Sequence, residues 1–258
     1  MKERVTITLD STMLAHLDSL VDQRRFKNRS HVIESILRDA VKINRPKKAV
    51  ILAGGKGSRL YPITQEIPKP MLPVKGKPII EHLIDFFKAN GIKDIILSVG
   101  FKKEVIKDYF GSGAKLGISI TYIEEDEPLG TAGPLVKAKH LLTETFVVSN
   151  GDELKDFDLA DMYLMHKQTN ALATIALTQV ENPEEYGAVL LQGNKIVAFL
   201  EKSKKNIDTN LINSGLYLFE PEIFSYLTAK GKLMFETDVF PVLAKQEKLY
   251  GYPFVGQW

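Results

Sequence analysis

The residues best suited to chemistry lie between positions 52 and 74, where glycines and basic side chains follow a short apolar run. Three glycines fall within four positions: Gly54, Gly55 and Gly57. Because these residues lack side chains, they would let backbone N–H groups approach a phosphate closely. Arg59 adds a rigid guanidinium and Lys69 a more mobile ammonium, and both groups suit an anion. A glycine-rich turn without a ligand would not explain these two basic residues, so the segment predicts a phosphate-binding loop.

Two better-known phosphate-binding loops are excluded by the order of these residues. A Walker A loop ends in Gly-Lys followed by Ser or Thr, but here Lys56 precedes Gly57 and Ser58 follows it. A dinucleotide-binding fingerprint would require a third glycine at the position of Leu60. The remaining pattern is Gly-Gly-x-Gly-Ser-Arg-Leu-x-Pro, followed closely by Pro-Lys-Pro.

A second chemical group is the carboxylate of Asp152, which follows an apolar stretch within the tripeptide Asn-Gly-Asp. A carboxylate at the end of a strand, beside a phosphate loop, suits Mg²⁺. This ion binds one or two carboxylates and fills its other positions with phosphate oxygens and water. An Asn-Gly turn without a metal is the alternative. We therefore expect Asp152 to bind Mg²⁺ next to the glycine loop.

Alternating strands and helices would position these residues. The periodicity of apolar residues predicts strands at 49–52, 94–99, 118–123 and 146–149, and helices at 79–90, 103–110 and 134–142. This alternation is typical of an α/β fold with a Rossmann-like, mostly parallel sheet and helices on both faces. Ligands of such sheets bind beyond the carboxyl ends of the strands, where the glycine loop and Asp152 both fall.

A small unit of different character precedes this fold. Apolar and polar residues alternate from Arg4 to Asp10, which predicts a strand with one buried and one exposed face. Two amphipathic helices follow it. We expect Ser11 or Asp10 to cap the first helix and Ser30 to cap the second.

Charge and composition separate the two parts of the chain. Residues 43–48 show no periodicity and contain a proline, which predicts a boundary between a domain at 1–44 and a larger one at 47–258. The first 45 residues hold nine basic and six acidic side chains, although the formal net charge of the whole chain is only +2. There is no cysteine, no apolar run of membrane-spanning length and no signal-peptide pattern. We therefore expect a cytoplasmic protein without a membrane segment.

The glycine loop, with Pro-Leu-Gly-Thr-Ala-Gly at 128–133 and Asp-Val-Phe-Pro at 238–241, resembles the sugar-1-phosphate nucleotidyltransferases, in particular the mannose-1-phosphate guanylyltransferase branch. A plain helix-start turn is the alternative for 128–133. The resemblance implies nucleotide binding by Leu52, Ala53, Gly54, Gly55, Gly57, Ser58, Gly130 and Thr131. It implies sugar binding by Gly187, Glu201 and Asn213. It assigns catalysis to Arg59, Lys69 and Lys202, and metal binding to Asp152.

The reaction implied by this resemblance joins an NTP and a sugar 1-phosphate. An oxygen of the sugar phosphate attacks the α-phosphorus in line, and an NDP-sugar and pyrophosphate form with Mg²⁺ as cofactor. Members of the family continue with a Trp-x-Asp-x-Gly segment whose aspartate is a second metal ligand, whereas this sequence stops at Trp258. We therefore expect a nucleotidyltransferase domain with an incomplete C-terminal end, which either works with fewer carboxylates or is inactive.

The strand and two helices at 1–44 resemble the ribbon-helix-helix domains of small repressors, which pair two chains through the strand. The resemblance implies a homodimer. By position, Arg4, Thr6 and Thr8 would enter the DNA major groove. Dimerisation without DNA binding is the alternative for this domain. For the whole chain, the competing function is a DNA-binding regulator whose transferase-like domain senses a nucleotide or nucleotide sugar.

Overall fold

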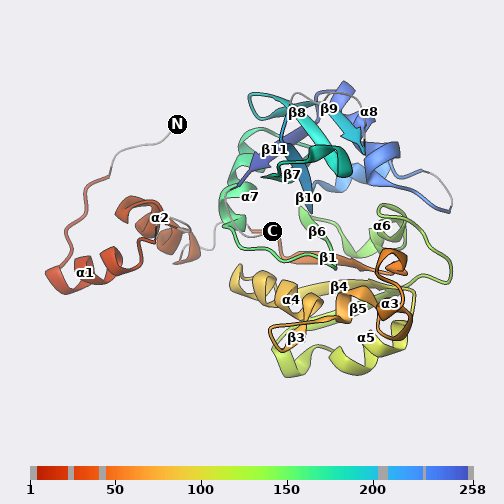
Figure 1. The fold of residues 1–258 in the computed structure, drawn as a ribbon. Helices are drawn as coiled ribbons and strands as arrows, with labels where there is room; N and C mark the ends of the chain where they lie inside the picture. The colour runs from red at the N-terminus through yellow and green to blue at the C-terminus, as the bar shows by residue number, and fades with distance from the viewer. Residues whose placement is uncertain (1–4, 23–25, 41–44, 203–208, 229–230, 255–258) are drawn as a thin grey trace. The chain divides into compact units, whose positions relative to one another are not determined.

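The computed structural model describes residues 5–22, 26–40, 45–202, 209–228 and 231–254, with the backbone alone for 38–40. The chain divides into two compact units, residues 1–45 and 46–258 (Figure 1). Among the described residues, no helix combines the length and the apolar character needed to cross a lipid bilayer.

The first unit contains two helices, α1 (Ser11–Ser19) and α2 (Arg29–Ala40). Asp10 caps α1, because its carboxylate accepts a hydrogen bond from the N–H of Met13. This residue was one of the two expected caps. For α2 the structure corrects the prediction: the side chain of Asn28 accepts from the N–H of His31 at 2.9 Å, whereas Ser30 already lies inside the helix.

The strand expected at 4–10 is not formed over residues 5–10, which lead to α1 without regular structure. A β-strand needs a hydrogen-bonded neighbour, and the described part of a single chain supplies none at this point. Of the residues predicted to contact DNA, Thr6 and Thr8 are exposed on this segment, and Arg4 lies outside the described residues.

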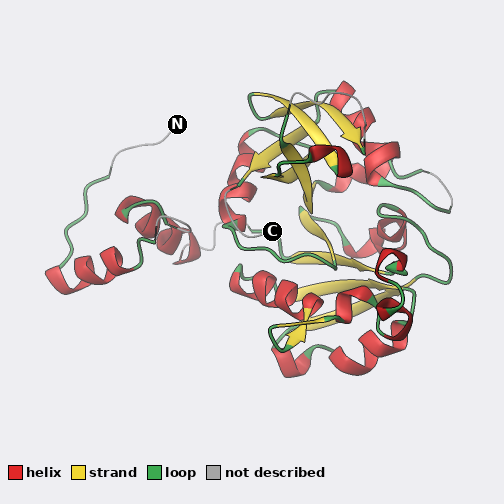
Figure 2. Ribbon diagram, viewed as in Figure 1, coloured by secondary structure: helices red, strands yellow, loops and turns green. Residues whose placement is uncertain are grey.

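In the described part of the second unit, nine strands form one mixed sheet (Figure 2). Their order is β5-β4-β1-β6-β10-β7-β11-β9-β8. The bounds of these strands are β1 (Lys48–Ala53), β4 (Asp94–Val99), β5 (Ser119–Glu124), β6 (Phe146–Asn150), β7 (Ala173–Gln179), β8 (Gly187–Gln192), β9 (Lys195–Glu201), β10 (Leu211–Phe219) and β11 (Leu249–Pro253). A separate two-stranded ladder joins β2 (Pro73–Val74) and β3 (Lys77–Pro78).

The parallel arrangement predicted from the sequence is confirmed for one half of the sheet only. The strands β5, β4, β1 and β6 are parallel neighbours. Beyond them, β10 runs antiparallel to β6 and β7, and β9 runs antiparallel to β11 and β8. The cause is local, because β8 and β9 form a hairpin around a turn at Gly193, which reverses the chain without a helical crossover. The prediction of a mostly parallel sheet was therefore wrong for the second half.

Helices cover both faces of the sheet. Their bounds are α3 (Ile63–Glu66), α4 (Ile79–Ala89), α5 (Lys103–Phe110), α6 (Gly133–Ala138), α7 (Leu159–Gln168) and α8 (Phe240–Lys245). On β1, Ile51 packs into one core with α4 and α7, whereas its neighbour Val50 packs into a second core with α6 and α8. A strand that is buried on both sides reads as a continuous apolar run, which explains the sequence at 49–52.

Candidate functional site

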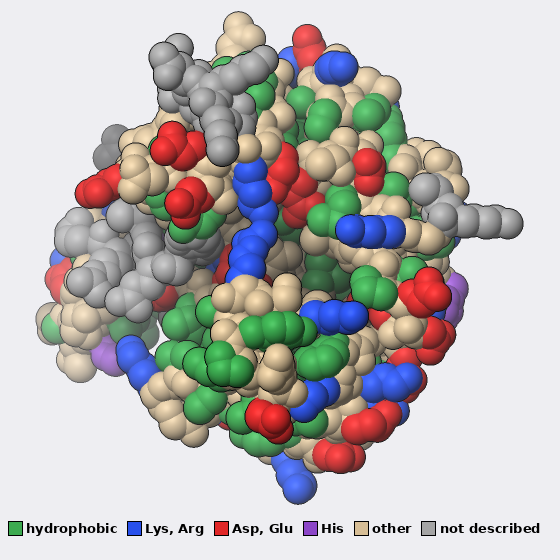
Figure 3. All heavy atoms as spheres, turned by 45° about the vertical axis from the view of Figure 1, so that its right-hand side comes forward, with side chains coloured by type: hydrophobic (Ala, Val, Ile, Leu, Met, Phe, Trp, Pro, Cys, Tyr) green, Lys and Arg blue, Asp and Glu red, His purple; other side chains and the backbone are tan. Residues whose placement is uncertain are grey.

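A cavity opens at the carboxyl ends of β1 and β6, two parallel neighbours inside the sheet. Its volume is about 390 Å³. Nine residues singled out from the sequence line it: Leu52, Ala53, Gly54, Gly55, Gly57, Lys69, Gly130, Thr131 and Asp152. Figure 3, which brings the side of α3 and α6 forward, shows basic and acidic side chains around a hollow in the surface. The fold thus gathers most of the predicted nucleotide-binding and metal-binding residues at one edge of the sheet.

Glu125 explains why the first position of the glycine loop is a glycine. A Cβ atom at Gly54 would lie 2.3 Å from Oε1 of Glu125, far inside contact distance. The carboxylate is held there because it accepts from the hydroxyl of Ser98 at 2.7 Å and from the N–H of Leu129 at 3.0 Å. It therefore joins β4 to the loop after β5 and leaves room for backbone only at residue 54. Sequence analysis missed Glu125, because the acidic run 124–127 reads as a solvated surface.

The loop at 129–132 is fastened to the segment around Leu233. Two backbone hydrogen bonds, each of 2.9 Å, join the loop to this residue. The hydroxyl of Thr131 donates to Oε2 of Glu236 at 2.7 Å and accepts from the N–H of Phe235 at 2.9 Å. Thr131, which we predicted to bind the nucleotide, lines the cavity, but its hydroxyl is engaged by these two partners.

Glu236 lies on a single π-helical turn, Phe235–Val239. Burial raises the pKa of its carboxyl above the ordinary value, and the hydrogen bond from Thr131 opposes this rise. The charges of Glu201 and Lys202 also act on this carboxyl, so the three charged side chains share one neighbourhood. Sequence analysis predicted no role for Glu236, because a π-helical turn is a feature of backbone geometry rather than of residue pattern.

Asp152 and Lys69 meet at the cavity. Oδ2 of Asp152 lies 2.5 Å from Nζ of Lys69, and about one third of each side chain is exposed. Asp152 follows β6 closely, and Lys69 begins the short 3₁₀ helix Lys69–Met71. A partly exposed carboxylate beside a cavity with a glycine-rich wall fits Mg²⁺, which combines one protein carboxylate with phosphate oxygens of a ligand. The carboxylate of Asp152 is therefore suited to bind a divalent metal.

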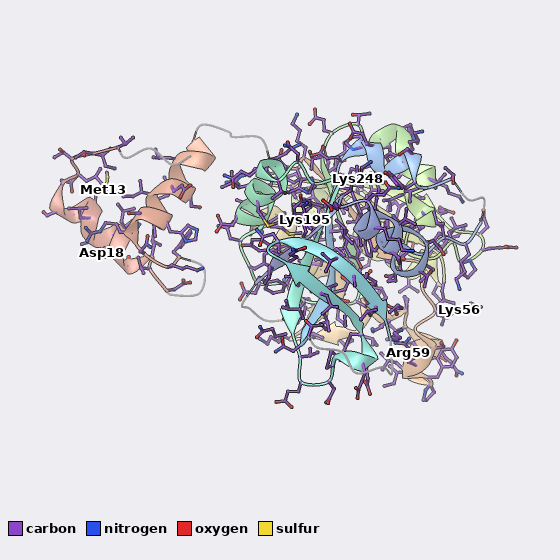
Figure 4. All side chains as sticks on the ribbon, turned by 90° about the horizontal axis from the view of Figure 1, so that it is seen from above. Met13, Asp18, Lys56, Arg59, Lys195 and Lys248 are labelled. Atoms are coloured by element: carbon purple, nitrogen blue, oxygen red, sulfur yellow. The ribbon has the colours of Figure 1, made fainter. Side chains whose placement is uncertain are left out.

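Two of the predicted catalytic residues lie outside the cavity lining given by the described residues. Arg59 belongs, with Ser58, to the exposed 3₁₀ helix Ser58–Leu60. Figure 4 shows Arg59 near the margin of the molecule. Lys202 is exposed as well, and its Nζ lies 3.4 Å from Oε1 of Glu201. Both residues therefore lie outside the described lining of the cavity, whereas Lys69 belongs to it.

The three residues predicted to bind the sugar lie on neighbouring strands. Gly187 of β8 pairs with Glu201 of β9, and Asn213 lies on β10, which also contacts β8. The register of β10 shifts between Asn213 and Tyr217, which marks a bulge. The side chain of Asn213 donates to the hydroxyl of Tyr217 at 2.9 Å and accepts from the N–H of Gly215 at 2.8 Å. These three residues are close to one another, although they are not among the described residues that line the cavity.

Comparison with known proteins agrees with this division of the chain. Residues 48–258 match the nucleotidyl transferase family, and residues 3–43 match the ribbon-helix-helix proteins of the copG family. A mannose-1-phosphate guanylyltransferase of Mycobacterium tuberculosis is 39% identical over 214 residues, which cover 81% of this chain and 59% of that protein. The catalytic subunit beta of mannose-1-phosphate guanylyltransferase from Danio rerio is 38% identical over 217 residues, with 82% and 60% covered. The chain thus spans about 60% of the length of these relatives.

Solved structures show the same fold. A structure described as a glucose-1-phosphate thymidylyltransferase from Bacillus anthracis matches with a TM-score of 0.74 and 31% identity, covering 82% of this chain and 87% of that one. A UDP-glucose pyrophosphorylase complexed with UDP-glucose matches with a TM-score of 0.71 at 24% identity, covering 83% and 92%. The second of these likenesses concerns the fold alone.

Proposed function

The chain belongs to the nucleotidyl transferase family, and on this premise we propose that it joins a nucleoside triphosphate to a sugar 1-phosphate. A phosphate oxygen of the sugar 1-phosphate would attack the α-phosphorus in line. The bond from the α-phosphorus to the oxygen that it shares with the β-phosphorus would break, and pyrophosphate would leave. The observation that carries this proposal is the cavity, where the glycine loop, Lys69 and Asp152 converge. Because two relatives are named mannose-1-phosphate guanylyltransferases, we propose GTP and mannose 1-phosphate as the substrates.

We assign the nucleotide to the glycine-loop side of the site, formed by residues 52–58 and 125–131. Backbone N–H groups of the loop can approach phosphates closely because Gly54 and Gly55 carry no side chains. The ammonium of Lys69 would neutralise negative charge near the α-phosphorus. We propose that Asp152 holds Mg²⁺, which would neutralise further phosphate charge when bound.

We assign the sugar phosphate to the bulge side of the site, formed by residues 150–155 and 213–217. We propose that Glu201 and Asn213 contact sugar hydroxyls and that Gly187 leaves room for the sugar ring. Lys202 would neutralise the sugar phosphate, and Arg59 would stabilise the departing pyrophosphate.

Pyrophosphate release in the presence of Mg²⁺ tests this function. Each of GTP, ATP, UTP, CTP and dTTP is combined with mannose 1-phosphate, glucose 1-phosphate and other hexose and pentose 1-phosphates. We expect turnover with one pair, and we expect Asp152→Ala to abolish it. Asp94→Ala is the matched control, because this exposed aspartate begins β4, at the opposite end of the parallel strands from the cavity. Absence of turnover with every pair, in a folded protein, would overturn the proposal.

DNA binding by a dimer is a second candidate function, and it concerns the N-terminal unit, which matches proteins of the ribbon-helix-helix class. In the single chain, Val5, Ile7 and Leu37 are each at least 50% exposed. Apolar side chains of a unit this small need a partner surface, and a second copy would cover them by pairing the two N-terminal segments. We therefore propose a homodimer through this unit. The proposed DNA contacts are Arg4, Thr6 and Thr8.

Two measurements test the N-terminal unit. In sedimentation, the wild type should be a dimer, and Leu37→Glu should shift it toward the monomer because a charge would be buried at the interface. Binding to a duplex should weaken steeply with salt and be lost in the double variant Thr6→Ala/Thr8→Ala. A dimer that binds no duplex would leave dimerisation of a cytoplasmic enzyme as the role of this unit.

A further inference from the structure

Lys155 is a buried lysine, three residues after Asp152 in the loop that follows β6. Its side chain has no exposed surface, and its Nζ donates to Oε2 of Glu153 at 2.5 Å and to the backbone carbonyl of Ser214. Burial lowers the pKa of this lysine, while the negative charges of Glu153 and Asp152 oppose the shift. The ammonium thus bridges two chain segments, the loop after β6 and the strand β10.

Glu153, the partner of Lys155, links this ion pair to the cavity. Glu153 is 22% exposed, and its other carboxylate oxygen accepts from Nδ2 of Asn150 at 3.2 Å. Asn150 is the last residue of β6 and lines the cavity. Glu153 follows Asp152 directly and contacts Asn150, two residues before it, so the charged pair can fix where the Asp152 carboxylate lies.

The bulge of β10 lies against Asn150 and Glu153. Gly215 has a φ of +70°, and a Cβ atom there would lie 2.5 Å from both Nδ2 of Asn150 and Oε2 of Glu153. Its N–H is bonded to Asn213, the residue proposed to contact the sugar. The backbone at Gly215 can approach the loop this closely only without a side chain.

A buried lysine with one carboxylate partner contributes little net stability, because the loss of hydration offsets most of the attraction between the charges. Apolar side chains would fill the same space as well, whereas a charged pair with directional hydrogen bonds fixes geometry. On the basis of the proposed function, we infer that Lys155 is a positioning residue. Its contacts with Glu153 and Ser214 hold the Asp152 loop and the Asn213 bulge in one fixed arrangement, so that metal and sugar phosphate are presented to each other correctly.

Two variants separate positioning from stability. Lys155→Met leaves Glu153 without its cation, so both the melting temperature and kcat should fall, with kcat lower by about 100-fold because reacting groups are misplaced. In Glu153→Gln/Lys155→Met no charge remains in the pair. Its melting temperature should therefore return toward that of the wild type while kcat stays low, and the KM for the NTP should change by less than about twofold.

Lys167→Met is the matched control, because Lys167 pairs with Glu220 at 2.5 Å after the far end of β10 and should leave kcat unchanged. Recovery of kcat together with the melting temperature in the double variant would overturn the inference. Hydrogen exchange of residues 150–155 and 211–217 needs no turnover: faster exchange of both segments in the double variant is expected, and unchanged exchange contradicts positioning. If the wild type turns over no substrate pair, the proposed function fails, and this exchange experiment still decides the role of Lys155.

Discussion

The glycine-loop side and the bulge side of the site are held in place by different interactions. On the glycine-loop side, backbone hydrogen bonds and the carboxylates of Glu125 and Glu236 fix the chain, and close packing leaves space only for backbone at Gly54. On the bulge side, a buried ion pair between Glu153 and Lys155 joins two segments. A wall of backbone N–H groups can bind phosphate oxygens without a permanent charge, whereas a metal and a sugar phosphate require charges at fixed positions.

This difference predicts different sensitivities to substitution. The glycine-loop side should be disturbed by added volume, since its neighbours are already in contact. The bulge side should be disturbed by changes of charge or of hydrogen-bonding capacity that leave volume nearly constant. The following substitutions test this contrast, beginning with the largest expected effect.

Asp152→Asn should lower kcat by about 1000-fold. The amide keeps the shape of the side chain but lacks the charge proposed to hold Mg²⁺, and it removes the ion pair with Lys69. The measurement is pyrophosphate release at saturating substrates, with circular dichroism to confirm the fold. A kcat within tenfold of the wild type would contradict the assignment of the metal to this carboxylate.

Gly54→Ala should raise the KM for the NTP at least tenfold and cost about 1–3 kcal/mol of unfolding free energy, because the new methyl group would overlap the carboxylate of Glu125. Gly55→Ala is the control for stability, since a Cβ atom there meets no atom within 4 Å. Steady-state kinetics gives the KM of Gly54→Ala, and urea unfolding compares the two variants. An equal loss of unfolding free energy at the two positions would show that packing against Glu125 is not the cause.

Asn213→Ala should raise the KM for the sugar phosphate about tenfold and leave the KM for the NTP unchanged. The variant loses the two hydrogen bonds that shape the bulge, to the hydroxyl of Tyr217 and the N–H of Gly215. Asn210→Ala, an exposed asparagine just before β10, serves as the control. If the KM for the NTP changed instead, Asn213 would act on nucleotide binding, which would contradict its assignment to the bulge side.

Glu236→Gln should have the smallest effect, a change in how stability depends on pH. Burial raises the pKa of Glu236 above 4.5, so its contribution to stability is full below pH 4.5 and is lost as the pH rises through the pKa of the folded state. Glutamine does not ionise, so the stability of the variant relative to the wild type should increase between pH 4.5 and 7.5. Urea unfolding at both pH values measures this, with the exposed Glu184→Gln as control. A difference that stays constant with pH would contradict the assignment.

Much of the first half of the larger unit could be predicted from the sequence. The strand at 94–99 and the helix at 103–110 agree with the structure to the residue, because their apolar spacing is regular. The order of the strands in the sheet could not be predicted, since nothing in the sequence of β11 indicates that it inserts between β7 and β9. The cap of α2 shows a smaller limit: Asn28 and Ser30 are both good capping residues, and only the backbone path selects Asn28.

The residues of the candidate site also divide into those that the sequence indicated and those that it did not. Its glycines and Asp152 were recognisable because steric and metal-binding demands restrict the residue type. Glu125 and Lys155 were not, because each lies among other charged residues and reads as part of a solvated surface. Their burial depends on segments distant in the sequence, as the contact of Lys155 with Ser214 illustrates. Arg59 and Lys202 were assigned through the resemblance to the family, and the structure leaves both exposed.

The position of β11 also has a consequence for how the protein folds. This is the last described strand in the sequence, yet it lies inside the sheet, parallel to β7 and antiparallel to β9. Pairing β7 with β11 closes a long loop, and such non-local contacts form slowly. Until residues 249–253 take their place, β7 and β9 each present an open edge to other chains. A newly made chain is therefore most vulnerable to aggregation in the interval before this one strand is inserted.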